Sequence, residues 1–311
     1  MNPFIYTLDN KRYHTLNYYN KSHFDKKVFK AIINTGCLCP NIDGTISKGG
    51  CIYCSNKSEY FSPSCEIPIK EQLDMEINRI HTKHEDAYVV AYFQSGTNTY
   101  GDFEKLKQNY ETVLTNPFVK GISIGTRADC ISDDMITYFK YLSSRTHLTI
   151  ELGLQSTNDD TAKVINRGHD FECFKTTFIK LKQAGIRTCV HIINSLPFED
   201  EATMLQTAKD VGSLYPDAVK IHMLHINKNT PIEKMYLDNK ITLLSKEEYV
   251  DIVVKQLELL PPTTVVERLT GDADKNVLVA PNWTRNKLSV LVEIDKLQAK
   301  LDSYQGLKFN K

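Results

Sequence analysis

Residues 30–55 read K-A-I-I-N-T-G-C-L-C-P-N-I-D-G-T-I-S-K-G-G-C-I-Y-C-S, a short apolar segment that runs into a glycine-rich loop. The apolar segment, residues 30–35, has the composition of a buried strand. The loop that follows holds four of the eight cysteines in the chain. Thiols grouped this closely in one loop indicate a metal or cluster site before any other use. The four are Cys37, Cys39, Cys51 and Cys54.

Strands and helices alternate along the chain after residue 30. Apolar runs are separated by segments whose apolar residues recur every three or four positions, as in Ile69, Leu73, Ile77 and Ile80. This alternation predicts parallel βα units with both faces of the sheet covered. We therefore expect an α/β fold, a partial (β/α)6 TIM-like barrel. The expected strands are residues 30–35, 87–93, 119–124, 147–154, 187–193 and 218–224.

The position of the cysteine loop fits a functional site. In such barrels the chemistry lies in the loops at the C-terminal ends of the strands. Residues 36–55 follow the first expected strand, so the barrel rule and the cysteine spacing indicate the same place.

Three segments make up the expected organisation: an N-terminal arm over residues 1–29, the barrel over 30–230, and a helical C-terminal extension over 231–311 packed on the barrel. In the arm, lysines and arginines alternate with tyrosines and phenylalanines. That mixture is compatible with nucleic-acid binding through stacking and phosphate contacts. Because aromatic rings are large apolar groups, the mixture fits better an arm that buries these rings against the domain.

Composition narrows the class of protein. No run of about 18 apolar residues is present, so we expect no membrane-spanning segment and no membrane partner. The N-terminal residues lack the features of a signal peptide. We expect a cytoplasmic protein, in which thiols stay reduced and act as ligands or nucleophiles. The balance of 38 basic and 38 acidic residues neither supports nor excludes nucleic acid.

Two metal sites are compatible with the cysteine spacing. All four thiols could bind zinc, although the single residue between Cys37 and Cys39 is a poor spacing for a zinc finger. Alternatively, Cys39, Cys51 and Cys54, which read C-x11-C-x2-C, bind three irons of a [4Fe–4S] cluster and leave the fourth open for chemistry.

A set of motifs resembles one known family. With the C-P-N-I-D-G-T loop, they resemble the radical S-adenosylmethionine (SAM) superfamily, and within it the YhcC/YtqA-like family, which is related to the radical SAM domain of the elongator catalytic subunit. The resemblance extends over residues 12–294. The further motifs are Y-F-Q-S-G-T-N-T-Y (92–100), S-I-G-T-R-A-D-C (123–130), E-L-G-L-Q-S (151–156), I-N-R-G-H-D (165–170), K-I-H-M-L-H (220–225) and R-L-T-G-D (268–272).

The resemblance implies a [4Fe–4S] cluster and SAM as cofactors. Cys39, Cys51 and Cys54 would bind three irons, and the amino and carboxylate groups of SAM would bind the fourth. Cys37 would be a packed bystander. Tyr53 lies where the superfamily commonly places an aromatic residue near the adenine.

Further SAM contacts are implied at the strand ends. Ser95, Gly96 and Thr97, with Gln94 beside them, resemble the element that meets the SAM amino group. Gln155 and Arg167 resemble a pair that contacts the ribose and carboxylate in coproporphyrinogen-type enzymes.

Two motifs depart from this pattern. G-T-R at residues 125–127 stands where related enzymes have a ribose-binding glutamate. I-I-N-S-L-P-F-E at residues 192–199 replaces the usual I-L-G-L-P-G-E.

The function implied is radical SAM chemistry on tRNA, processing the carboxymethylaminomethyl side chain of wobble uridine toward aminomethyl. The partners implied are tRNA and an electron donor such as flavodoxin or ferredoxin. Two alternatives stay open: a radical SAM enzyme acting on a small metabolite or a protein, and a non-enzymatic zinc-binding module that interacts with tRNA. As substrate contacts we expect His222, His225, Arg268 and Asp272.

Overall fold

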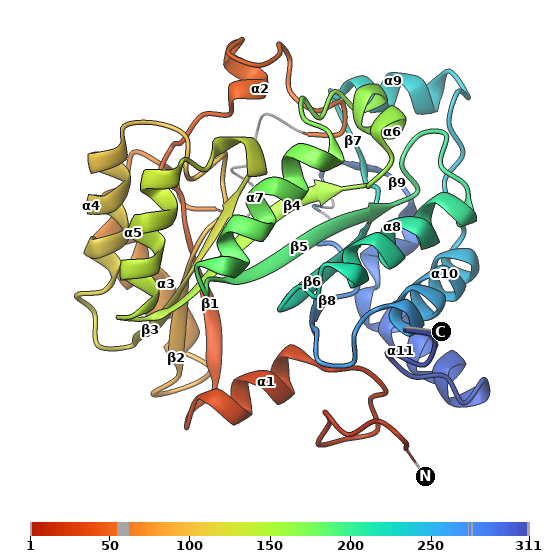
Figure 1. The fold of residues 1–311 in the computed structure, drawn as a ribbon, viewed down its shortest axis with the longest axis horizontal. Coiled ribbons are helices and arrows are strands. Elements are labelled where there is room, and N and C mark those ends of the chain that lie inside the picture. The colour runs from red at the N-terminus through yellow and green to blue at the C-terminus, as the bar shows by residue number, and fades with distance from the viewer. Residues whose placement is uncertain (1, 55–61, 273, 275, 310–311) are drawn as a thin grey trace.

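The computed structural model describes residues 2–54, 62–272, 274 and 276–309. A seven-stranded parallel sheet curves into a half-barrel, with strand order β1-β2-β3-β4-β5-β6-β8 (Figure 1). The predicted partial barrel is thus confirmed. No helix in the described ranges is long and apolar enough to cross a membrane. The strands are β1 (Val28–Ile33), β2 (Tyr88–Phe93), β3 (Val119–Thr126), β4 (His147–Gln155), β5 (Arg187–Asn194), β6 (Ala218–Met223) and β8 (Val265–Arg268).

The sheet has one strand more than the six expected. β8 pairs in parallel with β6, with Ala218 opposite Val265 and Lys220 opposite Arg268. Its four residues lie between Pro262 and the R-L-T-G-D turn, too short a run to show a strand period. It comes from the segment expected to pack outside the barrel. The short strands β7 (Ile226–Asn227) and β9 (Leu278–Ala280) form a separate antiparallel pair.

Helices cover the outer face of the sheet (Figure 1). Several begin just after an N-cap side chain that accepts a backbone N–H, among them the helices capped by Asp102, Ser132, Asp170 and Asp200. These caps fix where each strand-to-helix loop ends. The helices are α1 (Leu16–His23), α2 (Pro40–Asp43), α3 (Ile69–His81), α4 (Phe103–Val113), α5 (Asp133–Ser143), α6 (Asp159–Val164), α7 (Phe171–Gln183), α8 (Glu201–Ser213), α9 (Pro231–Leu237), α10 (Lys246–Leu259) and α11 (Lys287–Lys300), with 3-10 turns η2 (Ala128–Cys130) and η3 (Asn282–Arg285).

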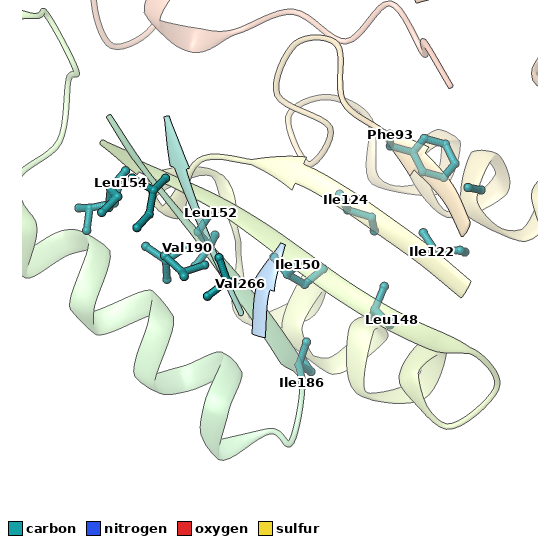
Figure 2. Packing of buried hydrophobic residues seen from close by; sticks show 14 of the residues in the cluster. Phe93, Ile122, Ile124, Leu148, Ile150, Leu152, Leu154, Ile186, Val190 and Val266 are labelled. Atoms are coloured by element: carbon teal, nitrogen blue, oxygen red, sulfur yellow. The ribbon is translucent and has the colours of Figure 1, made fainter. Parts of the chain in front are cut away.

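The two faces of the sheet differ in chemistry. Along β4, Leu148, Ile150, Leu152 and Leu154 alternate with more polar residues, and all four are buried in the core (Figure 2). Since successive side chains of a strand point to opposite faces, the residues between them face the inside of the half-barrel. The helices therefore cover the apolar face, and the inner face is left to carry polar groups.

The arm packs under the barrel. α1 lies at the end of the sheet opposite α2 (Figure 1). Tyr13 is buried in the main core, and the Tyr19 hydroxyl lies 2.8 Å from His147 Nε2. These contacts favour the packing interpretation of the arm's aromatic residues.

Candidate cluster and cofactor site

A cavity of about 590 Å³ lies at the C-terminal ends of the strands. It opens between the cysteine loop and the ends of β1 to β5. All ten residues that the sequence assigned to the cluster and SAM line it. These are Cys39, Cys51, Cys54, Tyr53, Gln94, Ser95, Gly96, Thr97, Gln155 and Arg167.

The cysteine loop begins with a tight turn that places its first thiol. Cys39 is the N-cap of α2, and Pro40 occupies the first helical position, which suits its fixed φ angle. Gly44 ends the turn at φ 96°, a conformation that glycine adopts without strain. The Asp43 carboxylate accepts hydrogen bonds from the Thr45 backbone N–H (2.9 Å) and the Tyr100 hydroxyl (2.9 Å).

Asn41 ties the loop to the segment after β4. Its fully buried side chain donates to the Asn166 carbonyl and to Cys51 Sγ at 3.6 Å. Asn166 in turn donates to the Gly50 carbonyl (2.8 Å) and accepts from the Ser47 hydroxyl (2.8 Å). The C-P-N and I-N-R-G motifs therefore form one hydrogen-bonded unit around Cys51, a role the sequence did not reveal.

Gly96 holds the first half of the loop. A β-carbon at this position would lie 1.9 Å from the Cys37 carbonyl oxygen, and the residue has φ +73°. The next residue, Thr97, donates its N–H to the Leu38 carbonyl (3.2 Å). The resemblance implies a SAM contact at residue 96, and in the structure the atoms nearest to an added β-carbon belong to Cys37 in the cysteine loop. Cys37 lines the cavity beside it, and burial raises the pKa of its thiol.

Arg167 reaches the second half of the loop. Its Nη1 donates to Cys51 Sγ at 3.9 Å, and its Nη2 donates to the Gly153 carbonyl. A β-carbon at Gly153 would lie 2.8 Å from Gln155 Nε2 and 3.2 Å from Arg167 Nη2. The glycine of the E-L-G-L-Q motif thus makes room for both predicted SAM contacts.

Arg127, in the motif that departs from the family pattern, also faces the site. It forms a two-pronged ion pair with Asp129 (2.9 and 2.7 Å) and donates to the Arg167 carbonyl (2.8 Å). In the described part of the chain, its Nη1 and the Nε of Arg167 are buried without a hydrogen-bond partner. Such donors are suited to an anionic ligand.

These features fit a cluster and SAM. Cys39, Cys51 and Cys54 present three thiols to one cavity, which Arg127 and Arg167 also line. Among the described residues no three His, Cys, Asp or Glu side chains are spaced to hold a single metal ion. The cavity is large enough for a group bigger than one ion.

Polar side chains form the floor of the cavity. Tyr92, Glu151 and His191 line it from β2, β4 and β5. Burial alone would raise the pKa of Glu151. The nearby charges of Lys220 and Lys30 outweigh this effect and hold the pKa well below its usual range. Burial and Lys220 lower the pKa of His191, so its ring is neutral at pH 7.

The four expected substrate residues do not line this cavity. Arg268 and Asp272 pair with each other at 3.2 Å, and Asp272 also pairs with Lys287. The centroid of the His222 ring lies 5.9 Å from that of His191. Burial lowers the pKa of His225 to about 4.

The second departing motif has a packing role. Asn194 and Gln256 exchange two side-chain hydrogen bonds, each 2.8 Å long, between β5 and α10. An asparagine in place of the family glycine thus fastens a helix of the C-terminal segment to the barrel.

Two family models match the chain. The model of the Radical SAM superfamily matches residues 42–211, and that of the Radical_SAM C-terminal domain matches residues 216–299. "Uncharacterized protein YtqA" of Bacillus subtilis is 44% identical over 312 residues, covering 100% of this chain and 97% of YtqA. "Protein YhcC" of Escherichia coli is 32% identical over 274 residues, covering 88% of each chain.

Elongator proteins are more distant. "Elongator complex protein 3" of Saccharomyces cerevisiae is 28% identical over 156 residues, which is 49% of this chain and 27% of that protein. The solved structure of Methanocaldococcus infernus Elp3 superposes with a TM-score of 0.67 at 17% identity, over 90% of this chain and 64% of that chain. That likeness shows the shared fold. The chain belongs to the radical SAM superfamily, whose members use a [4Fe–4S] cluster and SAM, and within it to the family of YtqA and YhcC.

Proposed function

We propose that Cys39, Cys51 and Cys54 bind a [4Fe–4S] cluster at which the chain reductively cleaves SAM. The observation that carries this proposal is that these three thiols line one cavity together with Arg127 and Arg167 at the strand ends. When bound, the cluster and SAM supply the low-potential electron and the hydrogen-atom abstraction that define the superfamily.

The chain's own residues hold and orient these groups. Arg127 and Arg167 line the cavity and would bind the SAM carboxylate, for which a guanidinium is well suited. Tyr53 packs on a small apolar cluster that includes Ile165 and offers its ring to the adenine. Gln94, Ser95, Gly96, Thr97 and Gln155 supply the remaining polar contacts around the cavity.

We propose that the substrate is the wobble uridine of tRNA, whose carboxymethylaminomethyl side chain is processed toward aminomethyl. Similarity to Elongator complex protein 3 over half of the chain supports this choice. A protein such as flavodoxin or ferredoxin would deliver the electron. Because tRNA is a polyanion, its binding would weaken as salt concentration rises.

The cluster assignment is tested on anaerobically purified protein. Wild type should be brown and hold about four irons per chain. The Cys39→Ala variant should lose the cluster, whereas Cys37→Ala should keep it, because Cys37 is a bystander. A colourless protein with one zinc, lost in either variant, would show the zinc-binding alternative instead.

The substrate assignment is tested by mass spectrometry of tRNA nucleosides. A strain that lacks the gene should accumulate carboxymethylaminomethyluridine, and the purified enzyme with SAM and reductant should convert it. Unchanged nucleosides, together with deoxyadenosine formation that no tRNA stimulates, would indicate a small metabolite or a protein as the substrate.

A further inference from the structure

Seven side chains form a buried charged layer under the cofactor cavity, on the inner face of the half-barrel. They come from six different strands, so only the folded sheet brings them together. We name this set the floor cluster. Its members are Lys30, Tyr92, Glu151, Arg187, His191, Lys220 and Glu267.

Two carboxylates connect the floor cluster. Glu151, whose side chain is fully buried, accepts from Lys30 Nζ (2.6 Å), from Lys220 Nζ and from His191 Nε2 (2.9 Å). Glu267 accepts from Lys30 Nζ (2.9 Å) and Arg187 Nη1 (3.1 Å). Both lysine ammonium groups also lie over the Tyr92 ring, at 4.6 and 4.7 Å from its centroid.

The charges of the floor cluster do not balance. Lys30, Lys220 and Arg187 are three cations, and they form ion pairs with only two carboxylates in the described residues. His191 is neutral, because burial and Lys220 lower its pKa. One positive charge is left over. Arg187, whose Nη2 is buried without a partner among the described residues, begins β5 and stacks on the Tyr19 ring, at the end of the strand away from the cavity. A net positive charge in a buried site is costly, so the cluster as a whole favours a bound anion.

The floor cluster is in reach of whatever occupies the cavity. Tyr92, Glu151 and His191 belong to the cluster and line the cavity. Lys30 does not line it, but its Nζ lies 2.6 Å from Glu151 Oε1. Lys30 keeps 26% of its side chain exposed, against 4% for Lys220. Lys30 is therefore the less enclosed of the two ammonium groups. In water-poor surroundings its attraction for an anion is weakly screened.

We propose that the floor cluster is the subsite for a carboxylate of the substrate, with Lys30 as the principal cation. This inference rests on the proposed function and refines it: the carboxymethylaminomethyl side chain ends in a carboxylate, and the aminomethyl product lacks it. The subsite would hold the group that the reaction removes. The product would then bind more weakly than the substrate and leave.

The test compares two anticodon stem–loop RNAs. One carries carboxymethylaminomethyluridine, and the other carries the same side chain ending in a neutral primary amide. KM and kcat are measured for each with the cluster-loaded enzyme. Wild type should show a KM for the amide that is about 10- to 100-fold higher, because a hydrogen bond to a charged group is lost.

A pair of lysine variants completes the test. Lys30→Met should raise the KM of the acid RNA and shrink the difference between acid and amide about tenfold. Lys27→Met, at the exposed residue directly before β1, should keep the wild-type difference. Iron content and thermal unfolding check that each variant folds. If Lys30→Met does not fold, the wild-type comparison still decides.

Three results would overturn the subsite. Equal KM values for acid and amide RNA in wild type would refute it while the proposed function stands. If folded Lys30→Met prefers the acid RNA over the amide RNA as strongly as wild type does, Lys30 does not bind the carboxylate and the subsite as proposed is wrong. Conversion of neither RNA would refute the proposed function and the subsite together.

Discussion

The Cys37 carbonyl oxygen lies 1.9 Å from the place that a β-carbon of residue 96 would occupy. We predict that Gly96→Ala displaces the cysteine loop, because the obstacle is backbone and cannot rotate away. The variant should unfold at a lower temperature than wild type and retain less iron after anaerobic reconstitution. Thermal melting and iron analysis measure these two effects.

Gly185→Ala is the matched control for this prediction. Gly185 has the same φ of +73°, but nothing lies within 4 Å of its added β-carbon. The left-handed backbone should destabilise both variants by roughly 1–2 kcal/mol. Only Gly96→Ala adds a clash between the new β-carbon and the Cys37 carbonyl oxygen. Equal stability and equal iron content in the two variants would show that the contact with Cys37 does not matter.

The buried amide of Asn41 offers a second prediction, on the cluster itself. Asn41 Nδ2 donates to Cys51 Sγ at 3.6 Å. Hydrogen bonds to cluster sulfurs stabilise the more negative, reduced state and raise its potential. Asn41→Leu should therefore lower the reduction potential of the cluster. A spectroelectrochemical titration followed by electron paramagnetic resonance measures it.

Ser47→Ala separates this effect from simple loosening of the loop. Its hydroxyl donates to Asn166 Oδ1 at 2.8 Å, in the same hydrogen-bonded unit but away from the sulfur. We expect the potential of Ser47→Ala to match wild type. A shift of equal size in both variants would assign the effect to loop position and not to the N–H···S bond.

The pattern of strands and helices was enough to predict the half-barrel, because continuous apolar runs separated by amphipathic segments leave few other folds. The cysteine loop was recognisable because its ligands are close in sequence. β8 was missed because four residues show no period. Arg127 was not predicted as a site residue, because its segment stands where related enzymes have a ribose-binding glutamate. Its position depends on Asp129 and on the carbonyl of Arg167, which lies 40 residues away in sequence.

The floor cluster was missed for a different reason. β4 reads H-L-T-I-E-L-G-L-Q, and its polar positions alternate strictly with apolar ones. That alternation could have marked Glu151 as facing inward. Its partners Lys30 and Lys220 lie 121 and 69 residues away in sequence. Only strand order and register bring them together, so the pairing could not be derived from local pattern.

The floor cluster leads to a prediction on pH and stability. Although burial raises it, Lys30 and Lys220 bring the pKa of Glu267 down to about 2, below its ordinary value near 4.5. A carboxylate whose pKa is lowered by folding stabilises the fold above the unfolded pKa. That stability is fully present at pH 7 and is lost as the pH falls from about 5 toward 2.

Glu267→Gln tests this dependence. Removing one partner of a buried ion pair should cost about 3–5 kcal/mol at pH 7. The variant should also lose less stability than wild type between pH 5 and pH 3, because the titrating group is gone. Urea unfolding at several pH values measures both. Glu293→Gln, at an exposed helix pair with Lys296, is the control and should follow the wild-type curve; parallel curves for all three proteins would contradict the prediction.

The reciprocal amide pair of Asn194 and Gln256 leads to a last prediction. Both side chains are buried, and Gln256 Nε2 also donates to the Met204 carbonyl at 3.0 Å. Asn194→Leu leaves the Gln256 oxygen unpaired and should cost about 1–3 kcal/mol. Adding Gln256→Leu removes the unpaired amide. The double variant should therefore lose less unfolding free energy than the two single variants lose together, by about 0.5–3 kcal/mol.

The same variants test what this asparagine does. Because its side chain is engaged by α10 and does not line the cavity, the KM for SAM should stay at the wild-type value in folded Asn194→Leu. Chemical unfolding measures the coupling energy, and deoxyadenosine formation at varied SAM concentration measures KM. If the stability losses of the two single variants simply add, the two amides do not stabilise each other. If Asn194→Leu keeps wild-type stability but raises the KM for SAM, Asn194 contributes to the cofactor site.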